Sequence, residues 1–274
     1  MDTKNKQFKN DKSPEYYRHY PRLFHKYFED IDKRIIDELS EAAYVYYKSV
    51  LLIDNIIDNK KIENIFQIST LQEKTIKILT SIFGINADFW KYWDCRKQEF
   101  AEAVDIERKL IIQKEVAWED YTSLADKKSA MGKMAIDSLY QLSKDKNNDI
   151  YQSLLESHYY FSAGFQLYDD VKDFEDDFKI GQFNWAIYEL SKQIDFNQYQ
   201  NEIHVLHKYL FIKGIAENVL SKSIETFQKA IDIILPLGIN SEWLNVIKEM
   251  KNTIANYLNI TSGYLNNVKK ERNT

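Results

Sequence analysis

The sequence is poor in residues that make tight turns and covalent cross-links. Its 274 residues include 7 glycines, 3 prolines and one cysteine, Cys95. Because β-sandwiches, barrels and collagen-like chains need many turn residues, this scarcity argues against them and favours long helices. A single cysteine forms no internal disulfide, which fits a reducing compartment. A chain of this length buries a large core, so small scaffolds stapled by disulfides or metals are excluded.

Two further absences bear on partners and location. No stretch approaches the ~20 consecutive apolar residues of a membrane helix, so we expect no membrane span. Residues 1–13 are polar and contain no apolar segment typical of a signal peptide, so we expect a cytoplasmic protein. The formal net charge of −5 gives no electrostatic reason to expect a nucleic-acid partner.

From Tyr16 onward, apolar residues recur every three or four positions, which is the period of an amphipathic helix. Strand-like alternation, linkers and internal repeats are absent. We therefore predict an all-α fold: a single-domain helical bundle around a central apolar pocket, with residues 1–14 as a disordered lead-in and 15–274 as the domain. Helices are expected over about 31–60, 69–84, 90–116, 118–142 with an interruption at Gly132, 150–178, 199–211, 216–235 and 241–268.

Residues 169–177 form the densest acidic cluster in the sequence, because six of these nine positions are acidic. On a helix, Asp169, Asp173 and Asp177 are spaced by four residues and share one face. Each pair of like charges at this spacing destabilises a helix by roughly 0.2–0.5 kcal/mol, a penalty that a bound cation reverses. Mg²⁺ prefers oxygen ligands and needs few carboxylates when a substrate phosphate also binds. The alternative is a solvated acidic helix end, but the apolar approach through Phe161 and Phe165 favours a site.

A second acidic pair, Asp54 and Asp58, lies four residues apart in the otherwise mostly aliphatic stretch 51–58. Carboxylates within an apolar run are costly unless something compensates them. The two acidic groups each end a long apolar helix, which predicts that both helices present carboxylates to one pocket with metal ions between them. Lys127 and Lys128 interrupt another predicted helix; they are either a surface pair or, at a pocket mouth, ligands for phosphate.

Together these segments resemble the class I isoprenoid synthases, which include prenyl diphosphate synthases, terpene cyclases and squalene/phytoene synthases. Residues 164–173, Gly-Phe-Gln-Leu-Tyr-Asp-Asp-Val-Lys-Asp, are similar to the second aspartate-rich motif of the trans-prenyltransferases, FQxxDDxxD. Asp169, Asp173 and Asp177 also match the spacing of the terpene-cyclase metal triad. Residues 49–58 resemble the first aspartate-rich motif, with Asn55 in place of its second aspartate. Residues 121–129 are similar to the family's Y-x₆-K-[ST] element.

The resemblance implies a set of site residues. The catalytic aspartates would be Asp54, Asp58, Asp169 and Asp173. These four, with Asp170 and Asp177, would bind Mg²⁺, and the family implies three ions. The substrate is expected to be a prenyl diphosphate, whose diphosphate would contact Lys128, Gln166 and Lys179. Helix faces beneath the aspartates supply candidates for the pocket wall, although such stripes are also typical of core packing: Tyr47, Val50, Leu51, His158, Ser162 and Phe165.

Departures from the family pattern decide which reaction is predicted. Residues 59–64, Asn-Lys-Lys-Ile-Glu-Asn, replace the Arg-Arg-Gly stretch of chain-elongating synthases, and the N-terminal Gly-Lys-x-x-Arg element is missing. In the family, these groups hold isopentenyl diphosphate; Arg18 and Arg22 are the candidates to replace them. We therefore predict a Mg-dependent terpene synthase that ionises one linear prenyl diphosphate, releases pyrophosphate, and cyclises or quenches the carbocation. 

Two alternatives remain open. One is a prenyl diphosphate synthase or prenyltransferase, head-to-tail or head-to-head, that uses two prenyl substrates; the FQxxDD form of the second motif favours it. The other is a non-catalytic partner subunit, which the retained aspartates disfavour. Members of the family commonly dimerise through long helices, so a homodimer is a further expectation, but nothing in the sequence identifies an interface.

Overall fold

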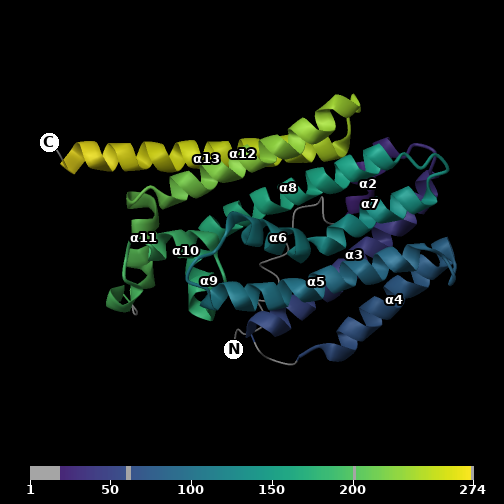
Figure 1. Ribbon diagram of the computed structural model, residues 1–274, viewed down its shortest axis with the longest axis horizontal. Helices are drawn as coiled ribbons and strands as arrows, with labels where there is room; N and C mark the ends of the chain where they lie inside the picture. Colours follow the sequence, from purple (N-terminus) through teal and green to yellow (C-terminus); the bar gives the residue numbers. More distant parts are fainter. Residues whose placement is uncertain (1–18, 60–62, 200–201, 273–274) are drawn as a thin grey trace, which may run out of the picture. The chain divides into compact units, whose positions relative to one another are not determined.

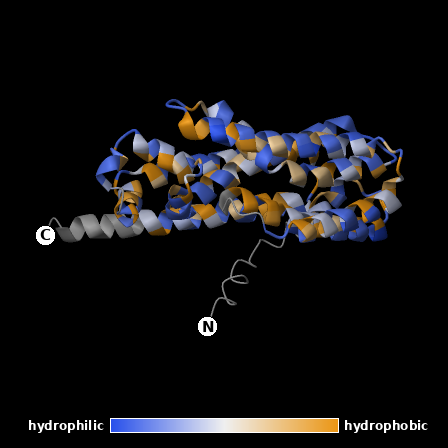
Figure 2. Ribbon diagram, turned by 90° about the horizontal axis from the view of Figure 1, so that it is seen from below, coloured by the Kyte–Doolittle hydropathy of each residue, from blue (hydrophilic) through white to orange (hydrophobic). Residues whose placement is uncertain are grey.

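The computed structural model describes residues 19–59, 63–199 and 202–272. Helices and short turns account for this part of the chain, and no strand occurs within it, which confirms the all-α fold class (Figure 1). Apolar and polar residues alternate along individual helices (Figure 2), as expected for helices that bury one face. The elements in chain order are α2 (Tyr20–Phe24), η1 (His25–Tyr27), α3 (Lys33–Asn59), α4 (Ile65–Phe83), α5 (Phe89–Ile112), α6 (Trp118–Lys128), α7 (Ala130–Leu142), α8 (Asn148–Lys172), α9 (Phe174–Ile180), α10 (Trp185–Ser191), η2 (Phe196–Tyr199), α11 (Ile203–Ile212), α12 (Ile215–Ile234), η3 (Leu235–Leu237) and α13 (Glu242–Arg272).

Most predicted helices are present, but some boundaries differ. The interruption expected at Gly132 is wrong: the chain breaks at Ser129, where the N–H of Ser129 bonds to the carbonyl of Ala125 and ends α6. Gly132 lies inside α7, where one glycine costs a helix only about 1 kcal/mol. The long helix expected over 150–178 is divided at Asp173 into α8 and α9. The predicted lead-in, residues 1–14, lies outside the described residues.

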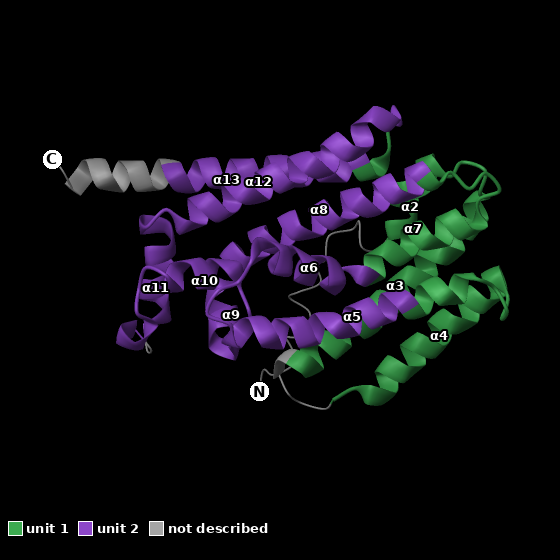
Figure 3. Cartoon of the chain, in the orientation of Figure 1, with its two compact units in different colours: residues 1–94, 131–148, 240–243 green, residues 95–130, 149–239, 244–274 purple. Residues whose placement is uncertain are grey.

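Contacts between residues divide the chain into two compact units (Figure 3). Unit 1 comprises residues 1–94, 131–148 and 240–243, and unit 2 comprises 95–130, 149–239 and 244–274. The expected domain, residues 15–274, remains a prediction. In the described part of the chain, none of the helices combines the length and the apolar character that a membrane span requires.

Unit 1 is built around α3, which packs against α4 and α2. Its core contains the rings of Phe24 and Trp243, whose centroids lie 4.8 Å apart and whose side chains are fully buried. The carboxylate of Asp30 accepts hydrogen bonds from the Ser143 hydroxyl at 2.8 Å and from the Lys144 backbone N–H at 2.6 Å. These bonds attach the chain before α3 to the end of α7.

Unit 2 is built around α8, which packs closely against α12. A Cβ atom added to Gly164 would lie 2.8 Å from the ring of Phe227, so a larger residue would force the ring or the helices to move where α8 meets α12. The Ser223 hydroxyl donates to the Gly164 carbonyl at 2.6 Å, and the Ser157 hydroxyl donates to the Ala230 carbonyl at 3.0 Å. These contacts fix α8, the helix that ends in the acidic segment.

Candidate active site

Three acidic side chains of unit 2 lie on successive turns at the end of α8 and in α9. The Asp173 N–H donates to the Asp169 carbonyl at 2.8 Å, and the Asp177 N–H donates to the Asp173 carbonyl at 2.9 Å. The four-residue hydrogen-bond pattern therefore continues across the break between the two helices. This geometry keeps Asp169, Asp173 and Asp177 in line, as their spacing predicts.

The pKa values of these aspartates are raised. Burial, followed by the charges of Asp173 and Asp177, raises the pKa of Asp169 to about 7. Burial is also the main cause that raises the pKa of Asp177 to about 6 and that raises the pKa of Asp173. Asp169 and Asp177 are half-buried and Asp173 is exposed, and holding three carboxylates close together disfavours their charged forms. A cation placed among them would relieve that cost.

Asp170 has a different environment from its neighbours. Successive helical residues lie about 100° apart around the axis, and Asp170 is turned into the interior, where it is 1% exposed. One carboxylate oxygen accepts the Tyr121 hydroxyl at 2.9 Å and the Trp185 backbone N–H at 2.7 Å, and the other accepts the Gln166 amide at 2.9 Å. Sequence reasoning grouped Asp170 with the metal ligands; these contacts instead join α8 to α6 and α10.

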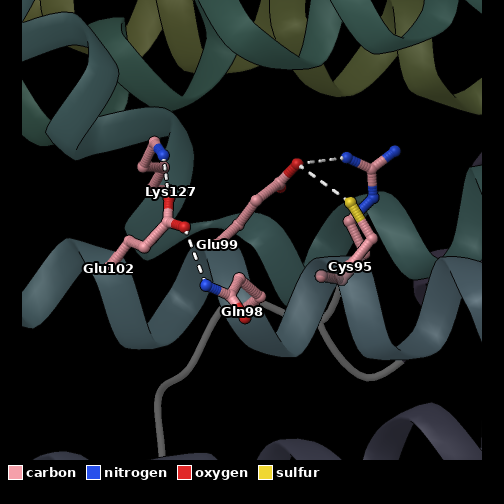
Figure 4. Close-up of polar contacts among 6 residues, drawn as sticks. Cys95, Gln98, Glu99, Glu102 and Lys127 are labelled. Atoms are coloured by element: carbon pink, nitrogen blue, oxygen red, sulfur yellow. Dashed lines mark hydrogen bonds and ion pairs between the residues drawn. The ribbon is translucent and has the colours of Figure 1, made fainter.

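The two lysines of the Tyr121–Ser129 segment have different partners. Lys127 forms an ion pair with Glu102 of α5, which also accepts the Gln98 amide at 3.1 Å (Figure 4). Lys128 forms an ion pair of 2.7 Å with Glu107, which follows Glu102 further along α5. The charge of Lys128 also opposes the effect of burial on the pKa of both Asp169 and Asp177. Lys128 therefore lies near the acidic cluster of Asp169, Asp173 and Asp177, and its role as a diphosphate ligand remains a prediction.

The other two predicted diphosphate ligands are less well placed. The Gln166 amide donates to Asp170, so this side chain supports a buried carboxylate. Lys179 is half exposed and pairs with Asp176 at 2.9 Å. Lys172 affects the aspartates directly, because its charge opposes the burial-induced rise in the pKa of both Asp169 and Asp173. Sequence reasoning missed Lys172, although it lies inside the motif.

The first acidic pair lies in unit 1. Asp54 is exposed in the last turns of α3, and the side chain of Asp58 lies outside the described part of the structure. Arg22 of α2, a candidate to replace the missing arginines, forms an ion pair of 2.9 Å with Asp37 of α3. Arg18, the other candidate, lies outside the described residues.

The predicted wall residues also fall in both units. In unit 1, Tyr47 and Val50 are half-buried, whereas Leu51 is 46% exposed. In unit 2, His158 and Ser162 are buried one turn apart on α8, and the Ser162 hydroxyl donates to the His158 carbonyl at 2.9 Å. Phe165 is half-buried and its ring stacks with that of Phe161 at a centroid distance of 6.3 Å. Their joint role as one pocket remains a prediction.

Unit 2 also contains an open cleft of ≈ 360 Å³ between the end of α5 and the chain that leaves α9. None of the predicted wall residues lines it. Its lining is mainly apolar and amide-bearing, and includes Leu110, Phe178, Phe183 and Asn184. Asn184, which sequence reasoning also missed, begins α10: its side-chain oxygen accepts the Ile187 N–H at 3.0 Å.

The acidic cluster fits a magnesium ion by the chemistry of its donors. All three aspartates offer oxygen ligands, and burial disfavours their charged forms, a cost that a bound cation would offset. Within the described residues, no group of three or more histidine, cysteine or acidic side chains is arranged to hold a metal by itself. Mg²⁺ commonly binds through one or two carboxylates, several waters and substrate phosphates, so the cluster suits a metal that arrives with a diphosphate.

Comparison with known proteins supports the fold. Neither a protein-family model nor a curated protein matches the chain by sequence. Among solved structures, a polyprenyl synthase from Roseobacter denitrificans superposes with a TM-score of 0.67 at 15% identity, covering 88% of this chain and 84% of that chain.

Two further solved structures are similar to a comparable extent. For a geranylgeranyl pyrophosphate synthetase from the archaeon Geoglobus acetivorans, the TM-score is 0.69 at 17% identity, with 86% of each chain covered. For an octaprenyl pyrophosphate synthase from Helicobacter pylori, it is 0.67 at 14% identity, with 85% of this chain and 87% of that chain covered. The chain therefore has the same all-α fold as these three synthases, as the resemblance of its motifs predicted.

Proposed function

We propose that this protein is a metal-dependent prenyltransferase, which ionises an allylic prenyl diphosphate and joins the prenyl group to a second prenyl substrate. One observation carries the proposal: the segment that resembles FQxxDDxxD places Asp169, Asp173 and Asp177 on successive turns, with Lys128 nearby. The proteins that share the fold support it, since each is described as a polyprenyl or prenyl pyrophosphate synthase.

The residues of the cluster divide the chemistry between them. Asp169, Asp173 and Asp177 would supply oxygen ligands for Mg²⁺, which would provide Lewis-acid chemistry toward the diphosphate. Lys128 and Lys172 would add positive charge where charge develops on the leaving group. The C1–O bond breaks and its electron pair leaves with pyrophosphate. The double bond of the second substrate then attacks C1, and loss of a proton gives the longer diphosphate.

The remaining expectations belong to the same proposal. Asp54 and Asp58 would be the second pair of metal-binding carboxylates, and the number of three ions rests on the family resemblance. His158, Ser162 and Phe165 would line the wall that shields the carbocation from water. A prenyl diphosphate substrate, a cytoplasmic location and a homodimer are proposed on the same basis.

A terpene synthase is the second candidate. Residues 59–64 contain no arginine, and Arg22 is engaged with Asp37. Both observations weaken the binding site for isopentenyl diphosphate that chain elongation requires. An enzyme without that site would ionise a single prenyl diphosphate and release a hydrocarbon or an alcohol.

Product analysis separates the two candidates. The purified protein is incubated with Mg²⁺ and C10, C15 or C20 allylic diphosphates, each with and without isopentenyl diphosphate, and the products are identified by mass spectrometry. We expect a longer diphosphate that forms only when both substrates are present. A hydrocarbon or alcohol formed from one substrate alone would make the protein a terpene synthase. If no substrate is consumed under any condition, both candidates are wrong.

A further inference from the structure

Asn184 connects the acidic cluster to the start of α10. Its side-chain amide nitrogen donates to the Asp177 carboxylate at 2.8 Å and to the backbone carbonyl of Asp170 at 2.7 Å. Its side-chain oxygen accepts the Ile187 N–H at 3.0 Å and caps α10. The residue is 1% exposed, so these contacts are shielded from water.

The partners fix the orientation of the amide. The Asp177 carboxylate and the Asp170 carbonyl act as acceptors, so they require the amide nitrogen, and the Ile187 N–H requires the amide oxygen. A flipped amide would lose all three hydrogen bonds. The Asn184 side chain is therefore held in one position, and it holds Oδ2 of Asp177 in turn.

Asp177 has a particular need for such a partner. It lies in α9, a helix of 7 residues separated from α8 by the break at Asp173. The charge of Asp173 repels it, in addition to the cost of its burial. A lysine or arginine in the place of Asn184 would hold the carboxylate but also cancel its charge. A neutral amide orients the carboxylate and leaves its negative charge available to a cation.

We infer that Asn184 is a positioning residue, which sets the orientation of the Asp177 carboxylate for binding of a divalent cation together with diphosphate. The inference rests on the proposed function, because that function assigns Asp177 to the cation. Asn184 also caps α10, and the test has to separate that structural contribution from the positioning of Asp177.

Two variants make this separation. Asn184→Asp keeps a good N-cap, since aspartate and asparagine cap helices about equally well, but it places a carboxylate against Asp177. Asn184→Ser keeps a capping hydroxyl and adds no charge, but its side chain is too short to span both contacts. Asn218→Asp is the control, because it introduces the same charge at an exposed position of α12 in unit 2.

The readout is the binding of Mn²⁺ in the presence of inorganic pyrophosphate. Binding is measured by the decrease in the EPR signal of the free ion. We expect the Mn²⁺ dissociation constant to rise about 10- to 100-fold in Asn184→Asp and about tenfold in Asn184→Ser, the range found when a residue behind a metal ligand is lost. We expect Asn218→Asp to bind as the wild type does. If Asn184→Asp does not fold, Asn184→Ser decides the question.

A double variant provides a further check. Asn184→Asp combined with Asp177→Asn exchanges donor and acceptor between the two side chains. We expect it to restore the hydrogen bond between them and part of the urea midpoint lost in Asn184→Asp, since the Asp170 carbonyl still lacks its donor, but not to restore Mn²⁺ binding. Wild-type affinity in both single variants would overturn the inference and leave the proposed function standing. Absence of Mn²⁺ binding by the wild type itself would overturn the proposed function and the inference together.

Discussion

The ammonium of Lys128 lies 2.7 Å from the carboxylate of Glu107, and both side chains are mostly buried. This ion pair holds Lys128 near Asp169 and Asp177, where the charge of Lys128 opposes the rise in both pKa values, while the charge of Glu107 adds to the rise for Asp177. In the proposed function, Lys128 would supply positive charge to a bound diphosphate. Glu107 belongs to none of the motifs identified in the sequence. Its contact with Lys128 becomes visible only in the structure, where α6 lies against α5.

Lys128→Gln should impair catalysis far more than the neighbouring substitution Lys127→Gln. Loss of one group that stabilises developing negative charge commonly lowers turnover by roughly 100- to 1,000-fold. Lys127 pairs with Glu102 instead, so its loss should lower turnover by less than about threefold. Steady-state pyrophosphate release measures both. Similar losses in the two variants would show that Lys128 acts only by joining α6 to α5.

Asp170→Ala should destabilise the fold severely. The change leaves the Tyr121 hydroxyl, the Trp185 N–H and the Gln166 amide without their common acceptor. Each unsatisfied buried group costs about 1–3 kcal/mol. Urea unfolding should show a loss of at least ~3 kcal/mol, and Tyr121→Phe a loss of about 1–2 kcal/mol. Unchanged stability together with lost Mn²⁺ binding would instead make Asp170 a metal ligand.

The fold and the alignment of three aspartates in the candidate site were predictable because their signals are local. Helical periodicity predicted the all-α architecture, and the four-residue spacing of Asp169, Asp173 and Asp177 predicted their alignment. The exceptions depend on tertiary contacts. Asp170 belongs to the same motif, but its role follows from Tyr121, 49 positions away along the chain. The short helix α10 escaped prediction because its stability depends on a cap, Asn184, which also contacts other segments.

The acidic cluster should make the protein less stable as the pH rises. Acidic residues with lowered pKa values have the opposite effect on stability. The folded-state pKa values of Asp169, about 7, and Asp177, about 6, exceed the usual value of 3.8. Between pH 4 and 7, the folded protein therefore binds more protons than the unfolded chain, and the free energy of unfolding from these groups falls as pH rises. The slope is about 1.4 kcal/mol per pH unit for each proton retained.

Urea unfolding from pH 4.5 to 7.5, with and without Mg²⁺ and pyrophosphate, measures this dependence. The cation should flatten the decline, because it takes the place of the protons. Asp169→Asn should reduce the slope in the absence of the cation. A slope that neither the ligands nor this substitution changes would mean that other groups dominate the titration.

Gly164→Ala should destabilise the protein by disturbing the close contact between α8 and α12. The added methyl group would lie 2.8 Å from the Phe227 ring, and overpacking of this kind typically costs about 1–3 kcal/mol. Phe227→Leu in the same chain should recover part of the loss by making room. Thermal unfolding of the single and double variants tests the contact, and an unaffected Gly164→Ala protein would contradict the close packing described for unit 2.

Metal-dependent release of pyrophosphate from an allylic prenyl diphosphate tests the central claim most directly. The assay supplies isopentenyl diphosphate and compares the wild type in Mg²⁺, the wild type in EDTA, and Asp169→Asn in Mg²⁺. We predict steady release by the wild type in Mg²⁺, none in EDTA, and a loss of at least about 100-fold in Asp169→Asn. Release that continues in EDTA, or that Asp169→Asn leaves unchanged, would contradict the assignment of the acidic cluster as the active site.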